Sequence, residues 1–413
     1  MFEAVERDVV AIRLPAWGRV AKFEGVVPWL VLGPGDVPVE PVRLFLVDFV
    51  ARDIRLGSVR SYCYDLLRWW RWLRVVGVEW DRATSAEVRD LVLWMKQVTK
   101  PRRSARTVSA ELAGTINPIT RKQYLDDRYK PATVQHSNAV LRTFYAYWIE
   151  QGQGPLINPV PLDRQGRRPH AHHNPLEPFR REGRVRYNPK IPKRRPRAMA
   201  DERWNELFTA MGSNRDRAIL AVAVSTAARA TELLGITGPD LDWGDQLVRV
   251  HRKGTSAEQW LPASAEAFVW LRLYIAEIGG LPPAGQSIWR TRRRRRKNDG
   301  QLTWKPLNYD ALRAVLRRAN ALLGSNWTMH DLRHTAAVRM VRDNSLSLRD
   351  VQTILGHAHL TTTQIYTEDD DQEVILRVRQ HLDHREEPTR KQPSPAAGGY
   401  EASDLAVLFG GEA

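Results

Sequence analysis

The apolar pattern of this 413-residue chain is interrupted near its middle. From Asn158 to about Ala198, Pro, Gly, Arg and His dominate, and apolar periodicity vanishes. Such a stretch is typical of a linker rather than of a packed element. The chain is also longer than one typical compact domain. We therefore expect one domain at residues 36–157 and a second at 199–385, joined by a linker at 158–198.

Both flanking regions carry apolar residues at helical spacing. The first contains VRLFLVDFVARD, SVRSYCYDLLRWWRWLRVVG, SAEVRDLVLWMKQV and TVQHSNAVLRTFYAYWIEQG, and each predicts a helix. Ser58 and Gly77 are the expected ends of the second helix, and the third opens at Ser85 without a capping box. Residues 1–35 hold strand-like and turn-like pieces, and we assign them no role. The first domain is therefore expected to be helical.

The second region adds a short β-structure to its helices. Helical patterns occur in DERWNELFTAMG, RDRAILAVAVSTA, YDALRAVLRRANALL, HDLRHTAAVRMVRD and SLRDVQTILG. LVRVHRK and EQWLPA flank GTSA, and their alternation predicts a β-hairpin. The expected fold class is mainly α with a small β-hairpin or sheet (α+β).

Several aromatic residues of the first region could stack on nucleic-acid bases or form a core. Side chains of this kind far more often pack inside, so we favour the core. The residues are Trp69, Trp70, Trp72, Tyr145, Tyr147 and Trp148.

The net charge of +16 is concentrated in two stretches. Between Arg164 and Arg197 there are twelve Lys or Arg against Glu177 and Glu182, and Arg290 to Lys297 holds seven with no acid. Dense positive charge suits a polyanion, because each neutralised phosphate releases counterions. A solvated loop or a sorting signal is the alternative. The candidate DNA contacts are Arg164, Arg167, Arg168, Lys193, Arg194, Arg195, Arg292, Arg293, Arg294, Arg295, Arg296 and Lys297.

Other compositional features exclude several classes of protein. Cys63 is the single cysteine, which excludes an intramolecular disulfide and a Cys-rich zinc site. The histidines at 170, 172 and 173 could suggest a metal, but a solvated linker explains them better. No apolar run reaches the roughly 18 residues of a membrane span, and MFEAVERDVVAIRLP lacks the pattern of a secretion signal. A cytoplasmic protein without a membrane partner is expected.

The candidate chemistry begins in HDLRHTAAVRM, where His330 and Arg333 are three residues apart and share a helix face. Alone, this HxxR pattern also occurs by chance. In SLRDVQTILGH, Ser347 and Asp350 can cap a helix, and Gly356 supplies a left-handed stop that fixes where His357 points. Nine residues later comes Tyr366, which alone would be taken for a half-buried packing residue.

Two further candidates lie upstream. Arg229 follows a strongly apolar helix, and Glu232 could orient it or form only a structural pair with it. Lys253 lies at the tip of the expected hairpin, where simple solvent exposure is the alternative.

Taken in order, these residues resemble the signature of tyrosine recombinases of the phage-integrase type. The strongest part is HDLRHTAAVRM followed by LGHAHLTTTQIYT. Ala227 and Ala228 stand where the family usually has Gly and Leu, and Arg252 stands where it often has Gly. The resemblance implies a helical core-binding domain followed by a catalytic domain. The site residues that it implies are Arg229, Lys253, His330, Arg333, His357 and Tyr366, with Glu232 in support.

The resemblance also implies a reaction, in which Tyr366 attacks DNA to form a 3′-phosphotyrosine and a free 5′-hydroxyl. Arg229 and Arg333 would hold the phosphate, His330 would assist proton transfer, and His357 would hydrogen-bond the phosphate or the tyrosyl oxygen. Lys253 would be the general acid. Neither cofactor nor metal is implied, and the sequence has no phosphate loop of the GxxxxGK[ST] type.

The implied partners are double-stranded DNA, a homo-tetramer in the synaptic complex, and an accessory DNA-bending or directionality protein. Two alternatives remain: a DNA-binding relative without catalysis, and an enzyme similar to type IB topoisomerases. Residues 386–413 are expected to be a flexible tail whose Leu405, Leu408 and Phe409 dock either on a neighbouring protomer or on their own domain.

Overall fold

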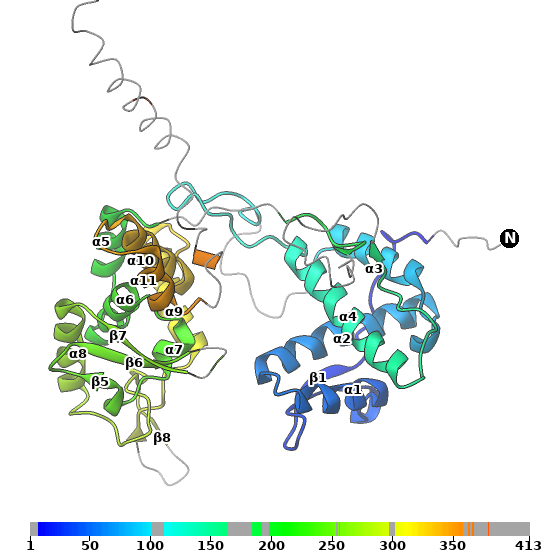
Figure 1. Ribbon diagram of the computed structural model, residues 1–413, viewed down its shortest axis with the longest axis horizontal. Helices are drawn as coiled ribbons and strands as arrows, with labels where there is room; N and C mark the ends of the chain where they lie inside the picture. Colours follow the sequence, from blue (N-terminus) through cyan, green and yellow to red (C-terminus); the bar gives the residue numbers. More distant parts are fainter. Residues whose placement is uncertain are drawn as a thin grey trace, which may run out of the picture. The chain divides into compact units, whose positions relative to one another are not determined.

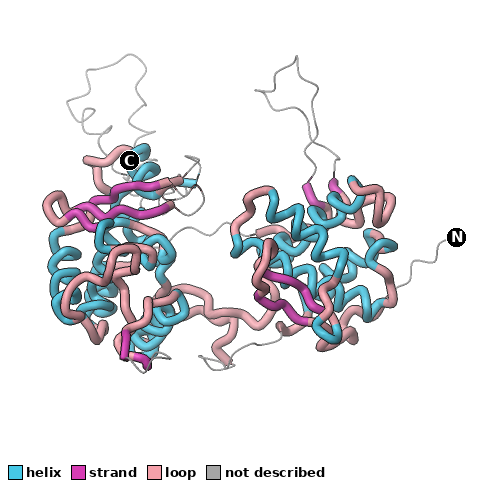
Figure 2. The backbone as a smooth tube through the Cα atoms, turned by 90° about the horizontal axis from the view of Figure 1, so that it is seen from below, coloured by secondary structure: helices cyan, strands magenta, loops and turns pink. Residues whose placement is uncertain are grey.

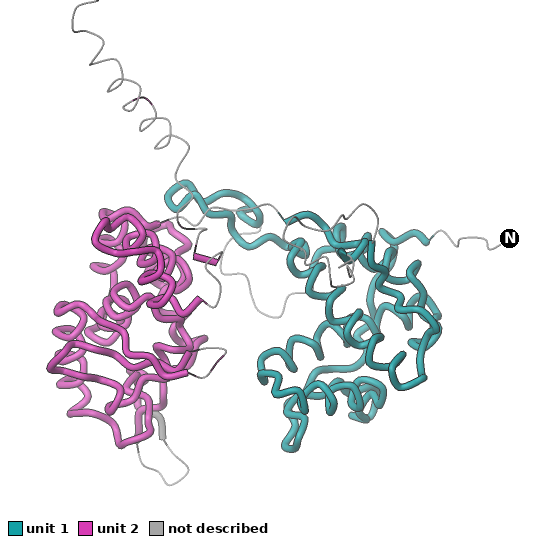
Figure 3. Tube along the Cα trace, in the orientation of Figure 1, with its two compact units in different colours: residues 1–193 teal, residues 194–413 magenta. Residues whose placement is uncertain are grey.

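The structure is a computed structural model that describes residues 7–100, 111–163, 184–191, 198–252, 255, 257–296, 302–357, 362–363, 366 and 379. The chain divides into two compact units, residues 1–193 and 194–413 (Figure 3). Each is mainly helical with small antiparallel sheets, so the expected fold class is confirmed. Among the described residues, no helix is long and apolar enough to cross a bilayer.

Unit 1 is built around one long helix. Its elements are β1 (Arg19–Lys22), β2 (Trp29–Leu32), η1 (Pro34–Asp36), α1 (Glu40–Ala51), α2 (Leu56–Val76), η2 (Trp80–Arg82), α3 (Ser85–Gln97), α4 (Pro131–Glu150), β3 (Leu162–Asp163) and β4 (Arg184–Val185) (Figure 1). Helix α2 packs against α1, α3, α4 and the β1–β2 hairpin. The hairpin contributes Leu30 and Val31 to the core, so part of residues 1–35 belongs to this unit.

The ends of two helices in unit 1 differ from the sequence-based expectation. Helix α2 begins at Leu56, before the expected Ser58, and its expected end is confirmed, since Gly77 is left-handed with φ +67°. Helix α3 has the capping box that we did not expect. The Thr84 side chain accepts a hydrogen bond from the Ala86 amide at 3.2 Å, and the Glu87 carboxylate accepts one from the Thr84 amide at 2.8 Å. The capping residue stands one position before the expected Ser85.

The aromatic residues of unit 1 form its core, as predicted. Trp69, Trp72 and Tyr145 are fully buried, and the Trp69 indole donates a hydrogen bond to the Tyr145 hydroxyl at 2.8 Å. That hydroxyl in turn donates to the Trp80 carbonyl at 2.8 Å. The polar atoms of the Trp69 and Tyr145 rings are therefore paired inside the unit. Neither of these two rings can stack on a base.

Unit 2 begins with α5 (Asp201–Thr209), α6 (Asn214–Thr226), α7 (Ala230–Leu234) and η3 (Gly238–Asp240). The three-stranded antiparallel sheet follows, formed by β5 (Leu241–Asp242), β6 (Leu247–His251) and β7 (Glu258–Pro262) (Figure 2). The chain continues through α8 (Ala265–Glu277), β8 (Arg295–Arg296), β9 (Leu302–Thr303), α9 (Tyr309–Leu323), α10 (Met329–Arg342) and α11 (Leu348–Leu355).

The apolar helix α6 lies at the centre of unit 2 and packs against both α8 and α10. Leu220 and Val222 of α6 and Leu332 of α10 are fully buried in one core cluster. The predicted hairpin is confirmed, because β6 pairs with β7 from Leu247↔Pro262 to His251↔Glu258. This core fixes α10 beside the end of α6, where the candidate site residues converge.

Candidate active site

Arg229 lies at a break between two helices. Helix α6 ends at Thr226, Ala227 takes the left-handed conformation with φ +52°, and Arg229 directly precedes α7. The left-handed residue stands at the position where the family usually has Gly, which adopts that conformation without steric cost. The break places Arg229 directly before α7, where its side chain reaches Glu232 in that helix.

The Glu232 carboxylate holds Arg229 in place. Its oxygens accept hydrogen bonds from the Arg229 guanidinium at 2.8 Å and from the Arg229 amide at 2.9 Å. The carboxylate is buried, and Arg252 forms a second ion pair with it at 3.2 Å. Glu232 thus orients two guanidinium groups, and the local pair predicted from sequence belongs to a larger network.

Arg333 projects from α10 and is only 4% exposed. Its guanidinium donates to the carbonyl of Ala227 at 2.5 Å and to that of Leu355 at 2.6 Å. Burial, followed by the nearby charge of Arg229, lowers the Arg333 pKa to about 10, so the group is still a cation at neutral pH. Arg333 therefore ties the end of α6 to the end of α11 while it carries charge in the site.

His357 follows α11 directly, because Gly356 ends that helix in the left-handed conformation. Its Nε2 lies 3.2 Å from the Arg333 guanidinium, and its Nδ1 lies 2.9 Å from the Thr363 hydroxyl. A guanidinium can only donate, so Nε2 accepts and Nδ1 carries the proton. Burial, then the charges of Arg333 and Arg229, lowers the His357 pKa to about 4. The imidazole is therefore neutral.

Tyr366 is 8% exposed, and its hydroxyl lies 2.9 Å from Nδ1 of His334. The Tyr366 ring is nearly parallel to that of His357, with centroids 6.3 Å apart. Burial raises the pKa of the phenol, while the charges of Arg333 and Arg229 act in the opposite direction. The site thus brings a protonated phenol together with two guanidiniums and two imidazoles.

His330 lies beside His334 on the same face of α10. His330 is exposed in the first turn of α10, and its ring contacts that of His334, with centroids 4.0 Å apart. His334 is the residue that meets the Tyr366 hydroxyl. Sequence reasoning missed His334, although its place four residues after His330 puts both on one helix face.

The sequence did not predict a role for Arg252, because two of its partners, Glu232 and Ile354, are distant in the sequence. Arg252 is buried, and its guanidinium donates to Gln259 at 2.8 Å and also to the Ile354 carbonyl. A Cβ on Gly356 would stand 2.9 Å from Nε of Arg252, so glycine there permits this close packing. Lys253 itself lies outside the described residues.

The basic stretches are only partly described. Arg292, Arg293 and Arg294 are exposed, and Arg294 stacks over Trp304 at 4.3 Å from the ring centroid. Arg290 differs from them, since it is buried and hydrogen-bonds Gln286. The structure does not describe Lys297 or the side chains of Arg295 and Arg296. Also outside the described residues are the three linker histidines, residues 386–413 and the linker candidates Arg164, Arg167, Arg168, Lys193, Arg194 and Arg195.

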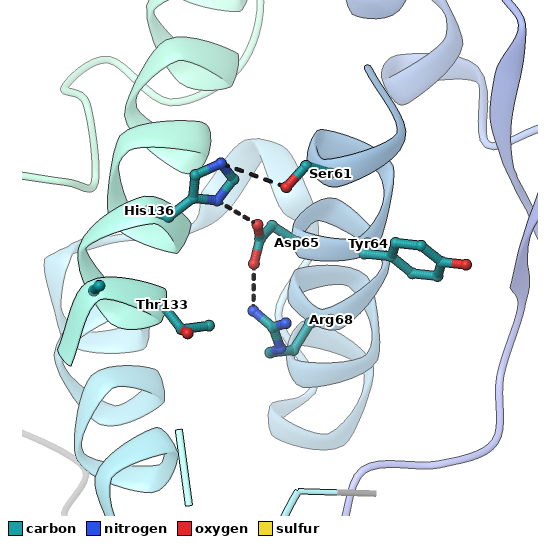
Figure 4. A pocket seen from close by; sticks show the side chains of 7 residues that line it. Ser61, Tyr64, Asp65, Arg68, Thr133 and His136 are labelled. Atoms are coloured by element: carbon teal, nitrogen blue, oxygen red, sulfur yellow. Dashed lines mark hydrogen bonds and ion pairs between the residues drawn. The ribbon is translucent and has the colours of Figure 1, made fainter. Parts of the chain in front are cut away.

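A shallow pocket of about 340 Å³ lies between α2 and α4 of unit 1 (Figure 4). In it, the Asp65 carboxylate pairs with both Arg68 and Nδ1 of His136, the latter at 2.7 Å, while Nε2 of His136 lies 3.5 Å from the Ser61 hydroxyl. The hydrogen bond to Asp65 raises the His136 pKa. The hydrogen bond between Asp65 and His136 therefore joins α2 to α4.

Comparison with known proteins agrees with this arrangement. The phage integrase family matches residues 198–373, and the phage integrase N-terminal SAM-like domain matches residues 45–113. Tyrosine recombinase XerC of Azotobacter vinelandii is 34% identical over 180 residues, which are 42% of this chain and 56% of that protein. Tyrosine recombinase XerD of Pseudomonas aeruginosa is 32% identical over 158 residues, or 37% and 49% of the two chains. The chain thus spans about half the length of these curated relatives.

Solved structures share the fold. The Tn1549 transposon integrase in complex with circular intermediate DNA superposes with a TM-score of 0.53 at 14% identity, over 82% of this chain and 98% of that one. A lambda integrase dimer bound to a COC′ core site gives 0.52 at 17%, over 80% and 95%. With both family descriptions matched in order, and with Arg229, Arg333, His357 and Tyr366 gathered in one site, the chain belongs to the phage integrase family of tyrosine recombinases.

Proposed function

We propose that this chain is a site-specific DNA recombinase that cuts and rejoins DNA strands through a 3′-phosphotyrosine at Tyr366. The main support for the proposal is the set of charged and aromatic groups around the Tyr366 phenol. Arg333 and Arg229 both act electrostatically on it, and His357 stacks beside it. Membership of the tyrosine recombinase family supports the same reaction.

We propose a separate role in the reaction for each residue of the site. Attack on phosphorus gathers negative charge on the non-bridging oxygens, and guanidiniums stabilise such charge through paired hydrogen bonds. We assign this role to Arg333 and Arg229. Neutral His357, whose Nδ1 donates to Thr363 and whose Nε2 accepts from Arg333, would hold Arg333 in position for the phosphate. Lys253 is our candidate for the acid that protonates the departing 5′-oxygen. Because the phosphotyrosine retains the bond energy, rejoining needs no nucleotide.

The proposed substrate is double-stranded DNA, bound by both units with the basic linker along its backbone. Phosphate contacts of this kind give affinity more than sequence choice. We further propose that four copies assemble on two duplexes, in the cytoplasm, for integration, excision or transposition of mobile DNA. An accessory DNA-bending or directionality protein would set the direction of the reaction.

Covalent capture tests the proposal directly. The chain is incubated with a plasmid library that carries random inserts, and DNA that stays attached under denaturing conditions is sequenced at its ends. We expect recurrent junctions with wild type and none with Tyr366→Phe, although this variant binds the captured site normally. A denaturant-resistant complex with Tyr366→Phe would refute the assignment of the nucleophile.

A second assay separates recombination from simple relaxation. Two captured sites on differently labelled duplexes should form a synaptic complex and exchange strands. Relaxation of a single-site plasmid without exchange would favour a topoisomerase, and binding without cleavage would favour a relative that lacks catalysis.

A further inference from the structure

His334 contacts the Tyr366 hydroxyl, and neither the sequence motif nor the family comparison assigns it a role. It stands directly after Arg333 on α10, and its Nδ1 lies 2.9 Å from the Tyr366 hydroxyl. The two rings have centroids 5.4 Å apart at an angle of 54°. The imidazole therefore approaches the phenol through a ring nitrogen at hydrogen-bonding distance.

Arg333 and His334 project from α10 in different directions. Successive residues on a helix point about 100° apart, so Arg333 and His334 face different neighbours. Arg333 turns inward to the Ala227 and Leu355 carbonyls. His334 turns toward Tyr366, and it shares its face with His330 one turn earlier. The helix thus delivers a cation for the phosphate and an imidazole for the nucleophile from adjacent positions.

The nucleophile needs a proton acceptor in this setting. Burial raises the pKa of Tyr366 above its usual value near 10, so the hydroxyl is protonated at neutral pH. The ring of His357 is nearly parallel to that of Tyr366, and both of its nitrogens already have partners in Arg333 and Thr363. His334 is the imidazole whose nitrogen meets the phenol oxygen.

We propose that His334 is the general base for Tyr366, in place of His330; this inference rests on the proposed recombinase function. In cleavage, the Tyr366 oxygen bonds to phosphorus while the bond from phosphorus to the 5′-oxygen breaks. The phenol proton passes to Nδ1 of His334, and the 5′-oxygen takes its proton from the general acid. In rejoining, the 5′-hydroxyl attacks phosphorus and gives its proton to that acid, and the departing tyrosyl oxygen recovers its proton from His334.

The test uses the full chain and an oligonucleotide duplex of the captured site, nicked so that cleavage cannot reverse. The rate of covalent complex formation is measured in a single turnover, and DNA affinity is measured separately. His334→Asn places an amide atom where Nδ1 stood, so it can keep a hydrogen bond but cannot accept the proton. We expect His334→Asn and His334→Ala to slow the reaction by about 10²- to 10⁴-fold, with DNA affinity unchanged. His330→Ala should be affected much less.

A substrate with sulfur in place of the bridging 5′-oxygen shows whether a slow variant lacks the general acid or the general base. A thiolate leaves without protonation, so this substrate restores variants that lack the general acid and leaves those that lack the base slow. We expect both His334 variants to stay slow on it. Restoration of their rates to that of wild type would overturn the inference, as would His334→Asn cleaving as fast as wild type or His330→Ala being the slower variant.

The controls separate this inference from the proposed function. If wild type forms no covalent complex, the recombinase proposal itself fails. If wild type forms it, Tyr366→Phe does not, and His334→Asn is as fast as wild type, the recombinase proposal stands and only the role of His334 falls.

Discussion

At the scale of single residues, Glu232 connects two guanidinium groups of the site. Its buried carboxylate pairs with Arg229 at 2.8 Å and with Arg252 at 3.2 Å. Removing one partner from a buried ion pair leaves an uncompensated charge, so we predict that Glu232→Gln lowers the free energy of unfolding by roughly 3–5 kcal/mol. Urea denaturation measures the change.

The matched control is Glu206, which forms an exposed pair with Arg203 at 2.8 Å at the same helical spacing. Glu206→Gln should cost no more than about 1 kcal/mol. Equal effects of the two substitutions would show that burial of the Glu232 network does not govern its contribution.

His357 should make the free energy of unfolding depend on pH. Its pKa is lowered from 6.5 to about 4 in the folded chain. Between these values the unfolded chain binds a proton that the folded chain does not, so the free energy of unfolding should fall as pH decreases from about 6.5 to about 4. We predict that His357→Gln makes this slope shallower in urea denaturation series across that range. An unchanged slope in the variant would contradict the assigned pKa.

Individual residues also mark where sequence reasoning succeeds and where it stops. The Arg229–Glu232 pair and the Ser347–Asp350 cap were predicted, because each joins residues three apart. His334 and Arg252 were missed, because their partners come from distant segments. Arg252 reaches the Ile354 carbonyl, about a hundred positions away, and His334 reaches Tyr366. No local pattern encodes these contacts, because each forms only when segments that are distant in the sequence pack together.

At the scale of elements, the end of α11 connects the helices to the site. Gly356 has φ +60°, and a Cβ there would stand 2.9 Å from Arg252. We predict that Gly356→Ala destabilises unit 2 and slows covalent complex formation, because it displaces Arg252 and turns His357. Denaturation and single-turnover cleavage measure the two effects.

Gly279 provides the comparison for that substitution. It has φ +80° and nothing within 4 Å of an added Cβ, so Gly279→Ala carries only the backbone cost of about 1 kcal/mol. The difference between the variants then reports the contact with Arg252. If Gly279→Ala slows cleavage as much as Gly356→Ala, the positioning role of this contact is wrong.

At the scale of the whole molecule, the proposed recombinase must bind DNA through its surface charge. Arg292, Arg293 and Arg294 are exposed in unit 2. We predict that their joint replacement by Gln flattens the plot of log affinity against log salt by roughly one unit for each DNA phosphate that is no longer neutralised. Arg203→Gln, an exposed arginine already paired with Glu206, should leave the slope unchanged. A triple variant with the wild-type slope would mean that these arginines do not touch the DNA backbone.

In the proposed reaction, Tyr366 itself becomes bonded to a 3′-phosphate of DNA. The most direct measurement is mass spectrometry of the covalent complex, formed in EDTA without nucleotide and digested with nuclease and protease. We expect a peptide that carries a nucleotide on Tyr366 through its 3′-phosphate, with a free 5′-hydroxyl on the other DNA end. A nucleotide on another residue, a 5′-phosphate link, or cleavage that depends strictly on a divalent ion would contradict it.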